Sequence, residues 1–452
     1  MTRLDRLALL VIALSSLTLG GLIFAGNQIP LTVRCQNCGQ VGPLGGVIFE
    51  FSRPVEPAAV EALWQTNPSL QGRWEWPDDR HARWLANQPL TLKQKTTFLF
   101  KPGKIGKNGE QLRGSNQWEV SVRQPLVLFY QDQNTGQEVY GIGLEKDAQV
   151  QQITHTGGKV YDFAPSTDGE TIVFSVINEK NGIDLWTVQR DGSNSGKLLD
   201  CGADRCSTPA WSPVSAEIAY TRESAGLDPN GPKGAPRVWI LDMSSSQTAA
   251  LFKDPQKIGY GPAWSPDGQR LAIWNGTAGG IQVVDRKSGD TILLNSESGD
   301  TGCWARDGKT LFYSNMVAGD AGTHTVVLKA DVGAGTVGTV LGGNAQDSNF
   351  SLDSPVCSPT EDWVAVTIQK NLQSPARELF LLNPDGQFGI SILDDQAKLP
   401  GFYSWTPGGD RLVFQVDALG GKETDTQIWV WDRYVNHKWM LVSGGRLPRW
   451  LP

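Results

Sequence analysis

From Leu126 to the end of the chain, short apolar runs alternate with polar turns, and one pattern of this kind returns several times. A typical copy is PAWSPDGQRLAIW at residues 262–274, where two apolar runs flank a Ser-Pro-Asp-Gly turn. Apolar runs of this length bounded by turn residues indicate β-strands. The residues that end the first run of each copy are Phe163, Trp211, Trp264, Trp304, Cys357, Trp405 and Trp450.

These positions recur at intervals of 40 to 53 residues, a period typical of propeller blades. A third apolar run follows in each copy, and a fourth closes the unit. The third runs begin near Val139, Leu185, Val238, Ile281, Thr325, Leu379 and Ile428. The last copy, at 447–452, has only a first strand, whereas residues 126–154 lack one. We therefore expect an all-β fold in which the C-terminal strand closes a seven-bladed β-propeller, because an open ring would leave unpaired strand edges.

The turn itself could suggest chemistry, since Ser265 and Asp267 lie two residues apart. Other copies do not keep these residues: Ala305 replaces the Ser in one copy, and Gly408 replaces the Asp in another. A turn tolerates such exchanges, because Pro presets φ, Asp bonds the backbone and Gly supplies positive φ. We interpret the motif as structural, with the Trp filling the space between blades.

The stretch PAWSPDGQRLAIW resembles the TolB-type propeller repeat, a WD-repeat-like unit of exported bacterial proteins that also occurs in prolyl-oligopeptidase-type peptidases. The resemblance covers residues 126–452 and implies a propeller fold, which hosts many activities. TolB is six-bladed and the repeats here predict seven blades, so the partner interaction of TolB is not carried over.

Residues 42–124 do not show the repeat of residues 126–452, although they also contain short apolar runs between turns. Val47, Phe49 and Phe51 alternate with polar positions, as in a half-buried strand. The stretch FEFSRPVEPAAV at 49–60 resembles bacterial Ig-like domains, which implies a β-sandwich that acts as a spacer or adhesion module. Its expected core residues are Trp74, Trp84, Phe98, Phe100, Trp118 and Val120.

Residues 7–26 carry no charge, and Arg3 and Arg6 precede them. Twenty apolar residues can span a bilayer as a helix, and the positive charges place the N-terminus in the cytoplasm. We expect a signal anchor with a cytoplasmic stub at 1–6, followed by a linker at 27–41. A cleaved signal peptide is the alternative, although Ile23 or Phe24 would then occupy a position that prefers small residues. Either interpretation exports the rest of the chain.

Export permits disulfides among the six cysteines. Cys35 and Cys38 form a CxxC motif, for which a disulfide is favoured over a zinc site or a redox role, because no second CxxC and no thioredoxin-like context accompany it. Cys201 and Cys206 flank a short loop that a disulfide could clip. We expect no metal and no cofactor.

Several functions find no support in the sequence. The net charge of −7 and the lack of a basic stripe argue against nucleic-acid binding. There is no GxSxG motif of a serine hydrolase, and the Gly-rich stretch 332–338 is not followed by a helix as a phosphate loop would be. None of the histidines has a partner at metal-ligand spacing; they are His81, His155, His324 and His437.

Strand order separates the two propeller faces. Loops between second and third strands lie on the same face as the crossovers between blades, and we call this the loop-rich face. Its longer loops are 222–237, 315–323, 369–377 and 417–426. Variable loops on a rigid scaffold favour binding. The positions four residues before the strand-ending residues should surround the channel mouth there: Lys159, Ser207, Tyr260, Asp300, Asp353, Gly401 and Arg446.

The sequence therefore predicts a non-catalytic scaffold at the cell envelope that binds a protein or glycan partner through the loop-rich face. The alternative is an envelope enzyme of the glycan lyase or hydrolase type with a site at the channel mouth. It would need two converging carboxylates, for which Asp300 and Asp353 are the candidates. An extracytoplasmic sensory domain is a third hypothesis, which the short cytoplasmic stub disfavours.

Overall fold

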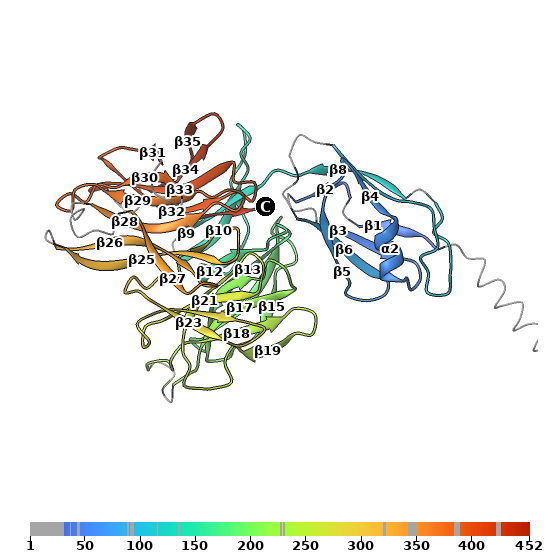
Figure 1. Cartoon of the computed structure of the whole chain (residues 1–452), viewed down its shortest axis with the longest axis horizontal. Coiled ribbons are helices and arrows are strands. Elements are labelled where there is room, and N and C mark those ends of the chain that lie inside the picture. Colours follow the sequence, from blue (N-terminus) through green and yellow to red (C-terminus); the bar gives the residue numbers. More distant parts are fainter. Residues whose placement is uncertain are drawn as a thin grey trace, which may run out of the picture. The chain divides into compact units, whose positions relative to one another are not determined.

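The computed structural model describes residues 31–452 except 37, 43–45, 88–89, 91–94, 115, 134–135, 227, 229–230, 320–321, 342–349, 384–388 and 422–425. The chain divides into two compact units between Arg123 and Gln124 (Figure 1). The expected anchor at 7–26 lies outside the described residues. Within the described part, no helix has the length and apolar character needed to cross a membrane.

The first unit contains two four-stranded sheets and the short helix α2 (Pro57–Leu63). One sheet has the order β1 (Val33–Cys35), β3 (Val47–Phe51), β6 (His81–Ala86), β5 (Gly72–Glu75). The other has the order β2 (Gln40–Val41), β8 (Gln117–Val122), β7 (Thr96–Phe100), β4 (Trp64–Asn67). Alternate residues of β3 are buried in an aromatic core, together with Trp84 and Phe98, while Trp74 and Trp118 are half-buried.

The second unit is a β-propeller whose sheets succeed one another along the chain (Figure 1). The sheet that joins the two ends of the unit has the order β11 (Gln151–Gln152), β10 (Gly136–Ile142), β9 (Leu126–Gln133), β36 (Gly445–Leu451). Two further groups of four follow, β12 (Val160–Pro165), β13 (Thr171–Ile177), β14 (Ile183–Gln189), β15 (Gly196–Leu199), and β16 (Arg205–Trp211), β17 (Glu217–Glu223), β18 (Arg237–Asp242), β19 (Gln247–Ala250). A single parallel pair, Ile183 with Arg205, joins these two groups.

Four more antiparallel sheets complete the described strands of this unit. They are β20 (Tyr260–Trp264), β21 (Arg270–Asn275), β22 (Gly280–Asp285), β23 (Thr291–Asn295); β24 (Cys303–Trp304), β25 (Thr310–Gly319), β26 (Gly322–Asp331), β27 (Thr336–Leu341); β28 (Ser351–Cys357), β29 (Val364–Gln369), β30 (Glu378–Leu382), β31 (Gly389–Leu393); and β32 (Lys398–Trp405), β33 (Arg411–Ala418), β34 (Gln427–Asp432), β35 (His437–Ser443).

The last strand, β36, pairs antiparallel with β9, the first strand of the unit, as the sequence predicted. Trp450 lies opposite Val127, and both are buried. Arg190 reinforces this junction, because its guanidinium donates hydrogen bonds to the backbone oxygens of Gln124 (2.5 Å) and Pro452 (2.5 Å). One side chain of another sheet thus holds both ends of the propeller.

The Ser-Pro-Asp-Gly turn is a structural clamp. The buried Ser265 hydroxyl donates to Asp267 Oδ1 at 2.5 Å and accepts the Arg270 N–H at 2.9 Å, while Gly268 adopts φ +66°. Ser166 makes the corresponding bonds to Asp168 (2.5 Å) and from the backbone of residue 171 (3.0 Å). The Ser hydroxyl and the Asp carboxylate of each turn are thus engaged in hydrogen bonds within that turn, which agrees with the structural interpretation of the motif.

Indole N–H groups join successive sheets. Each of five strand-ending Trp residues donates to a backbone carbonyl of the preceding first strand: Trp211 to Ala164 (3.1 Å), Trp264 to Ala210 (3.0 Å), Trp304 to Ala263 (3.1 Å), Trp405 to Val356 (3.1 Å) and Trp450 to Ser404 (2.9 Å). The acceptor always immediately precedes the strand-ending residue of its own strand. Ala164 therefore identifies Pro165 as the strand-ending residue of β12.

This register corrects one sequence assignment. Phe163 lies two residues too early, because the clamp begins at Ser166 and the acceptor is Ala164. The position four before Pro165 is Tyr161, so Lys159 does not occupy the expected place.

A second correction concerns residues 315–323, which were expected to be a loop. Their described members belong to a protruding hairpin of β25 and β26, paired from Thr310 with Asp331 to Gly319 with Gly322.

All six cysteines form disulfides. Two join near neighbours in sequence, Cys35 with Cys38 and Cys201 with Cys206. The third connects Cys303 of β24 with Cys357 of β28 and so links adjacent sheets. The sequence did not predict this third bond, because Cys357 was interpreted only as a replacement for the strand-ending Trp.

Candidate functional site

A cavity of about 1080 Å³ lies between first strands of the propeller, and we call it the channel cavity. Residues of β12, β28, β32 and β36 line its wall. Gln369 and Asp417, near the ends of second strands, also line it, as does Arg377 from the loop between β29 and β30. The cavity therefore opens on the loop-rich face, where the sequence placed the binding surface.

A repeated bulge shapes the rim of this cavity. The residue three positions before the strand-ending residue has positive φ in five first strands, and the ladder register shifts there. These residues are Thr208 (φ 49°), Gly261 (φ 64°), Ser354 (φ 55°), Phe402 (φ 47°) and Leu447 (φ 52°). Positive φ is costly for residues other than Gly, so surrounding contacts must hold the bulges.

Polar side chains of the preceding sheet supply those contacts. Thr221 Oγ1 accepts the Gly261 N–H at 3.1 Å, and Gln415 Oε1 accepts the Leu447 N–H at 2.9 Å. Both acceptor side chains are buried. A hydrogen bond in a buried place is costly to lose, because the bulged N–H would otherwise be unsatisfied. The rim is thus built by bonds between neighbouring sheets before any ligand arrives.

Exposed apolar side chains gather at this face. Phe402 is 60% exposed and Tyr161 is 50% exposed, although both are large apolar residues that line the cavity. Other exposed apolar residues lie next to or at equivalent bulges, in the second half of a second strand, or in the loop after one: Ile177, Tyr260, Met316, Leu419 and Leu447. Concentrations of exposed apolar side chains mark interaction sites on folded proteins.

Asp162 is the most unusual ionisable group of the cavity. Burial raises the pKa of its carboxyl, although the Ser175 hydroxyl and the Thr208 N–H (2.5 Å) donate to it. The nearby Arg449 guanidinium opposes this increase in pKa. Arg449 also donates to the Phe163 carbonyl at 2.8 Å and lies 5.5 Å from the centre of the Phe163 ring. The hydrogen bonds of Asp162 therefore link β12 to β13 and to β16.

Two of the residues expected at the channel mouth line the cavity, namely Asp300 and Gly401. Asp353 lies beside them, where its carboxylate accepts the Ser314 hydroxyl at 3.1 Å and pairs with Arg377 at 3.7 Å. Tyr260 is 38% exposed, and burial followed by the charge of Asp300 raises the pKa of its hydroxyl. Asp353 adjoins the cavity because its backbone carbonyl accepts the hydroxyl of Tyr403, which lines the cavity with Asp300 and Gly401, at 3.4 Å.

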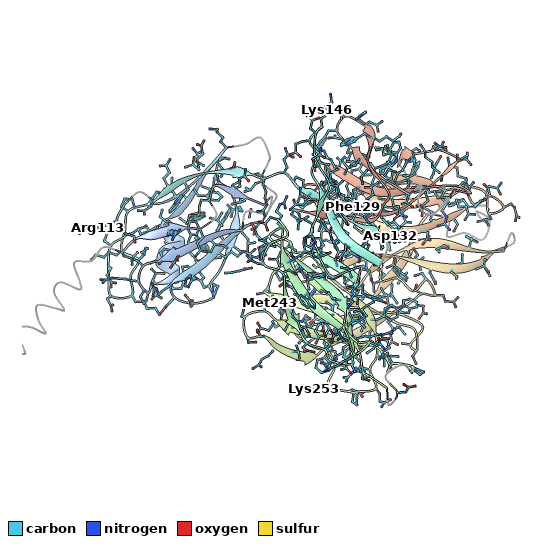
Figure 2. The ribbon with its side chains drawn as sticks, turned by 180° about the vertical axis from the view of Figure 1, so that it is seen from behind. Arg113, Phe129, Asp132, Lys146, Met243 and Lys253 are labelled. Carbon is cyan, nitrogen blue, oxygen red and sulfur yellow. A yellow bond between two sulfur atoms is a disulfide. The ribbon has the colours of Figure 1, made fainter. Side chains whose placement is uncertain are left out.

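The other three residues expected at the channel mouth are less available to a ligand in the channel cavity. Ser207 is buried, and Arg446 is engaged in an ion pair with Asp132 of β9, which is labelled in Figure 2. Lys159 lines a separate groove of about 460 Å³ beside Trp186 and Lys197. The displaced register of β12 explains this placement, since Tyr161 occupies the position that was assigned to Lys159.

Sequence reasoning did not identify Tyr161, Asp162, Phe402 or Arg449 as site residues. The sequence does contain a signal for the bulges close to the positions it examined. Four bulge residues with positive φ are each followed by a proline, namely Pro209, Pro262, Pro355 and Pro448. Of these four bulge residues, Ser354 and Leu447 line the cavity.

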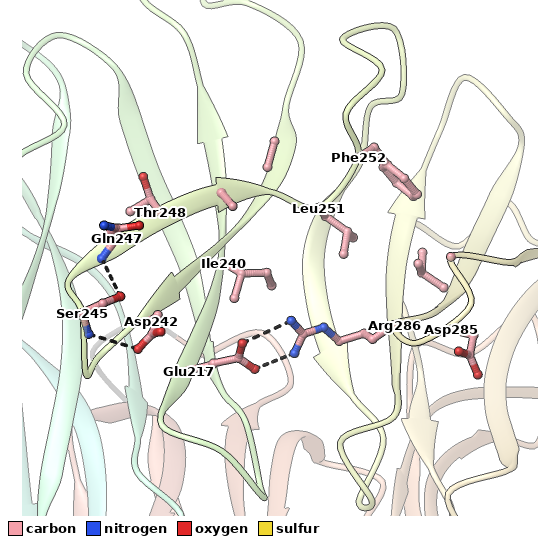
Figure 3. Close-up of a pocket in the computed structure, with 14 residues that line it drawn as sticks. Glu217, Ile240, Asp242, Ser245, Gln247, Thr248, Leu251, Phe252, Asp285 and Arg286 are labelled. Carbon is pink, nitrogen blue, oxygen red and sulfur yellow. Dashed lines mark hydrogen bonds and ion pairs between the residues drawn. The ribbon is translucent and has the colours of Figure 1, made fainter. Parts of the chain in front are cut away.

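A third depression lies away from the channel, between the outer parts of two sheets (Figure 3). Its volume is about 400 Å³. Glu217 and Arg286 form a two-point ion pair across it (2.5 and 3.2 Å), and Arg286 lies 4.9 Å from the centre of the Trp264 ring. These contacts satisfy the charged groups and join the sheets, so this depression has a structural role.

The described residues contain no group of three or more His, Cys, Asp or Glu side chains that could hold a metal ion. Asp300 accepts only the N–H of Gly302, at 3.2 Å, among the contacts of the described part. The channel cavity combines rigid walls, exposed rings and both signs of charge. Such a surface is suited to recognising a ligand.

No protein-family model matches the sequence, and no curated protein matches it either. Solved structures with a similar fold include TolB from Acinetobacter baumannii, at 16% identity and a TM-score of 0.41, covering 72% of this chain and 82% of that one. An oligogalacturonate lyase in complex with manganese has 15% identity and a TM-score of 0.42, covering 63% and 74%. One of two prolyl endopeptidases has 14% identity and a TM-score of 0.49, covering 71% and 50%. These likenesses concern the fold alone.

Proposed function

We propose that this protein is a non-catalytic, membrane-anchored scaffold outside the cytoplasm that binds a protein partner through the loop-rich face of its propeller. In this proposal residues 7–26 are the anchor and the first unit is an Ig-like spacer. The two four-stranded sheets around an aromatic core support a sandwich. Three disulfides support an oxidising compartment.

The propeller of the proposal has seven blades. The groups β12–β15 and β16–β19 are hydrogen-bonded into one eight-stranded sheet, but only through the parallel pair of Ile183 and Arg205, which supports counting them as two blades. Counting these groups as two blades, the sheet of β36 as one and the four later sheets as one each gives 2 + 1 + 4 blades.

The observation that carries the proposal is the group of exposed apolar side chains around the channel cavity. Leu447, Ile177 and Leu419 are aliphatic, and they occupy separate sheets of the same face. Aromatic rings alone would also suit a sugar, whereas branched aliphatic side chains spread over several sheets favour a protein surface. A protein partner is therefore preferred over a glycan.

An envelope enzyme of the glycan lyase or hydrolase type is the second candidate. One observation supports it: Asp162 and Asp300 line the same cavity, and burial raises the pKa of Asp162 as a general acid requires. This candidate predicts that Asp300→Asn abolishes the release of reducing ends or unsaturated products from a cell-envelope glycan. The scaffold proposal predicts no such activity in either variant or parent protein.

The scaffold proposal is tested by partner capture with the full chain in detergent-solubilised membranes of the native host. The test variant is Phe402→Asp/Leu447→Asp, which places charges among the exposed apolar residues. The matched control is Tyr434→Asp/Val435→Asp, because these residues are 72% and 70% exposed in the turn between β34 and β35, on the opposite face. We expect at least a tenfold loss of captured partner for the test variant only. Equal recovery with both variants would contradict the proposal.

A further inference from the structure

A smaller pocket adjoins the channel cavity on the same face, and we call it the basic pocket. Its volume is about 250 Å³, and Tyr161 lines both the pocket and the cavity. Seven residues line the pocket: Tyr161, Ile177, Asn181, Ile183, Arg205, Gly231 and Lys233. The two cavities thus form one continuous surface that turns around a single exposed ring.

The charged lining of the basic pocket is cationic only, whereas the channel cavity is lined by carboxylates and also by the guanidiniums of Arg377 and Arg449. The side chains of Arg205 and Lys233 are cationic, and the Asn181 amide can donate as well. No carboxylate lines the pocket. The channel cavity contains three, from Asp162, Asp300 and Asp417. A ligand that crosses the ring of Tyr161 therefore passes from a region of mixed charge to a basic one.

The position of Arg205 is fixed by covalent and backbone contacts. It is the first residue of β16, it pairs with Ile183 of β14, and Cys206 beside it is disulfide-bonded and buried. Glu223 faces Arg205 across the ladder, yet the described structure shows no ion pair between them and Glu223 does not line the pocket. The guanidinium is exposed and makes no hydrogen bond within the described part.

The opposite wall is fixed in the same way. Lys233 donates to the carbonyl of Ala203 at 3.4 Å, inside the loop that the disulfide of Cys201 and Cys206 closes. Asn181 adopts φ +56° in the turn between β13 and β14, with its N–H bonded to the Asn178 carbonyl at 3.2 Å. Two cations thus face a small pocket whose other walls are Tyr161 and the apolar Ile177.

We propose that the basic pocket is a subsite for a carboxylate of the protein partner, supplied by an Asp or Glu side chain whose neighbouring residue is apolar and covers Tyr161 and Ile177. This inference rests on the proposed function and specifies the partner. Arg and Lys donors facing a carboxylate form charge-assisted hydrogen bonds. The exposed Tyr161 and Ile177 account for the apolar neighbour, because covering them removes apolar surface from water.

The probes are three pentapeptides, acetyl-Gly-Leu-Glu-Leu-Gly-amide and its Gln and Lys analogues, titrated into the full chain in detergent. Peptide NMR linewidths give the dissociation constants. We expect the Glu peptide to bind at least fivefold more tightly than the Gln peptide, and the Lys peptide to bind least. The preference should disappear in Arg205→Gln/Lys233→Gln and remain in Arg205→Lys.

The matched control is Lys287→Gln/Lys309→Gln, which removes two exposed cations from turns of the opposite face. It should keep the preference for Glu. Thermal unfolding of each variant shows whether it is folded. Equal affinity for the Glu and Gln peptides, no binding of the Glu peptide at millimolar concentration, or an unchanged preference in the double variant would each overturn the inference. Partner capture with Phe402→Asp/Leu447→Asp tests the proposed function separately, so the two failures are distinguishable.

Discussion

The indole N–H of Trp264 donates to the carbonyl oxygen of Ala210 at 3.0 Å, and this bond joins the first strands of two successive sheets. Because four other Trp residues make the same bond, the sequence repeat has a direct physical counterpart at the sheet boundaries. The large aromatic both fills the space between sheets and satisfies a backbone oxygen.

Trp264→Phe keeps an aromatic ring and removes this bond. We expect the free energy of unfolding to decrease by about 1 kcal/mol, since one hydrogen bond is lost and a carbonyl is left without its partner. Urea unfolding followed by circular dichroism measures the change. Trp439→Phe is the control, because its half-buried indole N–H makes no hydrogen bond in the described structure. A loss for Trp439→Phe as large as that for Trp264→Phe would show that ring size, and not the bond, is responsible.

The disulfide between Cys303 and Cys357 spans 54 residues and links two sheets. In the chain-entropy model, a closed loop of this length contributes about 4 kcal/mol by restricting the unfolded chain. Cys303→Ser/Cys357→Ser should therefore lower Tm more than Cys201→Ser/Cys206→Ser, whose bond spans only five residues. Differential scanning calorimetry of both double variants checks this order. The reverse order would mean that native-state packing around these bonds outweighs loop length.

The part of the fold that the sequence could predict is the part that repeats. The Trp264 turn, the four strands of each repeat and the pairing of β36 with β9 follow from a pattern with several copies. Where a copy is irregular the prediction failed. The strand β12 ends at Pro165 and not at an aromatic residue, so Phe163 was wrongly predicted as its strand-ending residue. The position four residues earlier was therefore assigned to Lys159 when it belongs to Tyr161. The protruding hairpin of β25 and β26 was interpreted as a loop because its polar residues lack a clear period.

The candidate site was harder to predict for a physical reason. Its position depended on strand order, which the repeat supplied. Of the residues named on that basis, Asp300 and Gly401 line the cavity. Exposure of Phe402 and burial of Asp162 depend on the backbone geometry of the bulges and on bonds between neighbouring sheets. The side chains that make these bonds differ from one repeat to the next, so the sequence pattern does not indicate them. The link from Cys303 to Cys357 also joins separate repeats, so neither spacing alone nor local pattern indicates it.

Asp162 should make stability depend on pH. Burial raises the pKa of this carboxyl in the folded protein, so the folded state retains a proton that the unfolded chain releases near pH 4. Its contribution is fully present below that pH and is lost as pH increases through the folded pKa. As pH increases from 4 to 8, we expect the free energy of unfolding of the parent protein to decrease relative to that of Asp162→Asn. A difference that does not vary with pH would contradict the assigned direction.

Arg190 should control the closing strand. Without its guanidinium, the backbone oxygens of Gln124 and Pro452 lose their donors, and β36 is less firmly held against β9. We expect faster amide hydrogen exchange at 445–451 and 126–133 in Arg190→Gln. Arg306→Gln is the control, because Arg306 pairs with Asp362 at 2.9 Å far from this junction in sequence. Unchanged exchange in β36 would show that the antiparallel ladder alone holds the ring.

The central claim is that partners bind to the loop-rich face. Site-specific photo-crosslinking tests it most directly, with benzoylphenylalanine placed at Phe402 or at Tyr434 of the full chain in its native membrane. Both positions are exposed aromatic residues on opposite faces of the propeller, so they differ in location and little in accessibility. The account predicts a discrete crosslinked protein adduct from position 402 and none from position 434. An adduct from position 434 alone would contradict it.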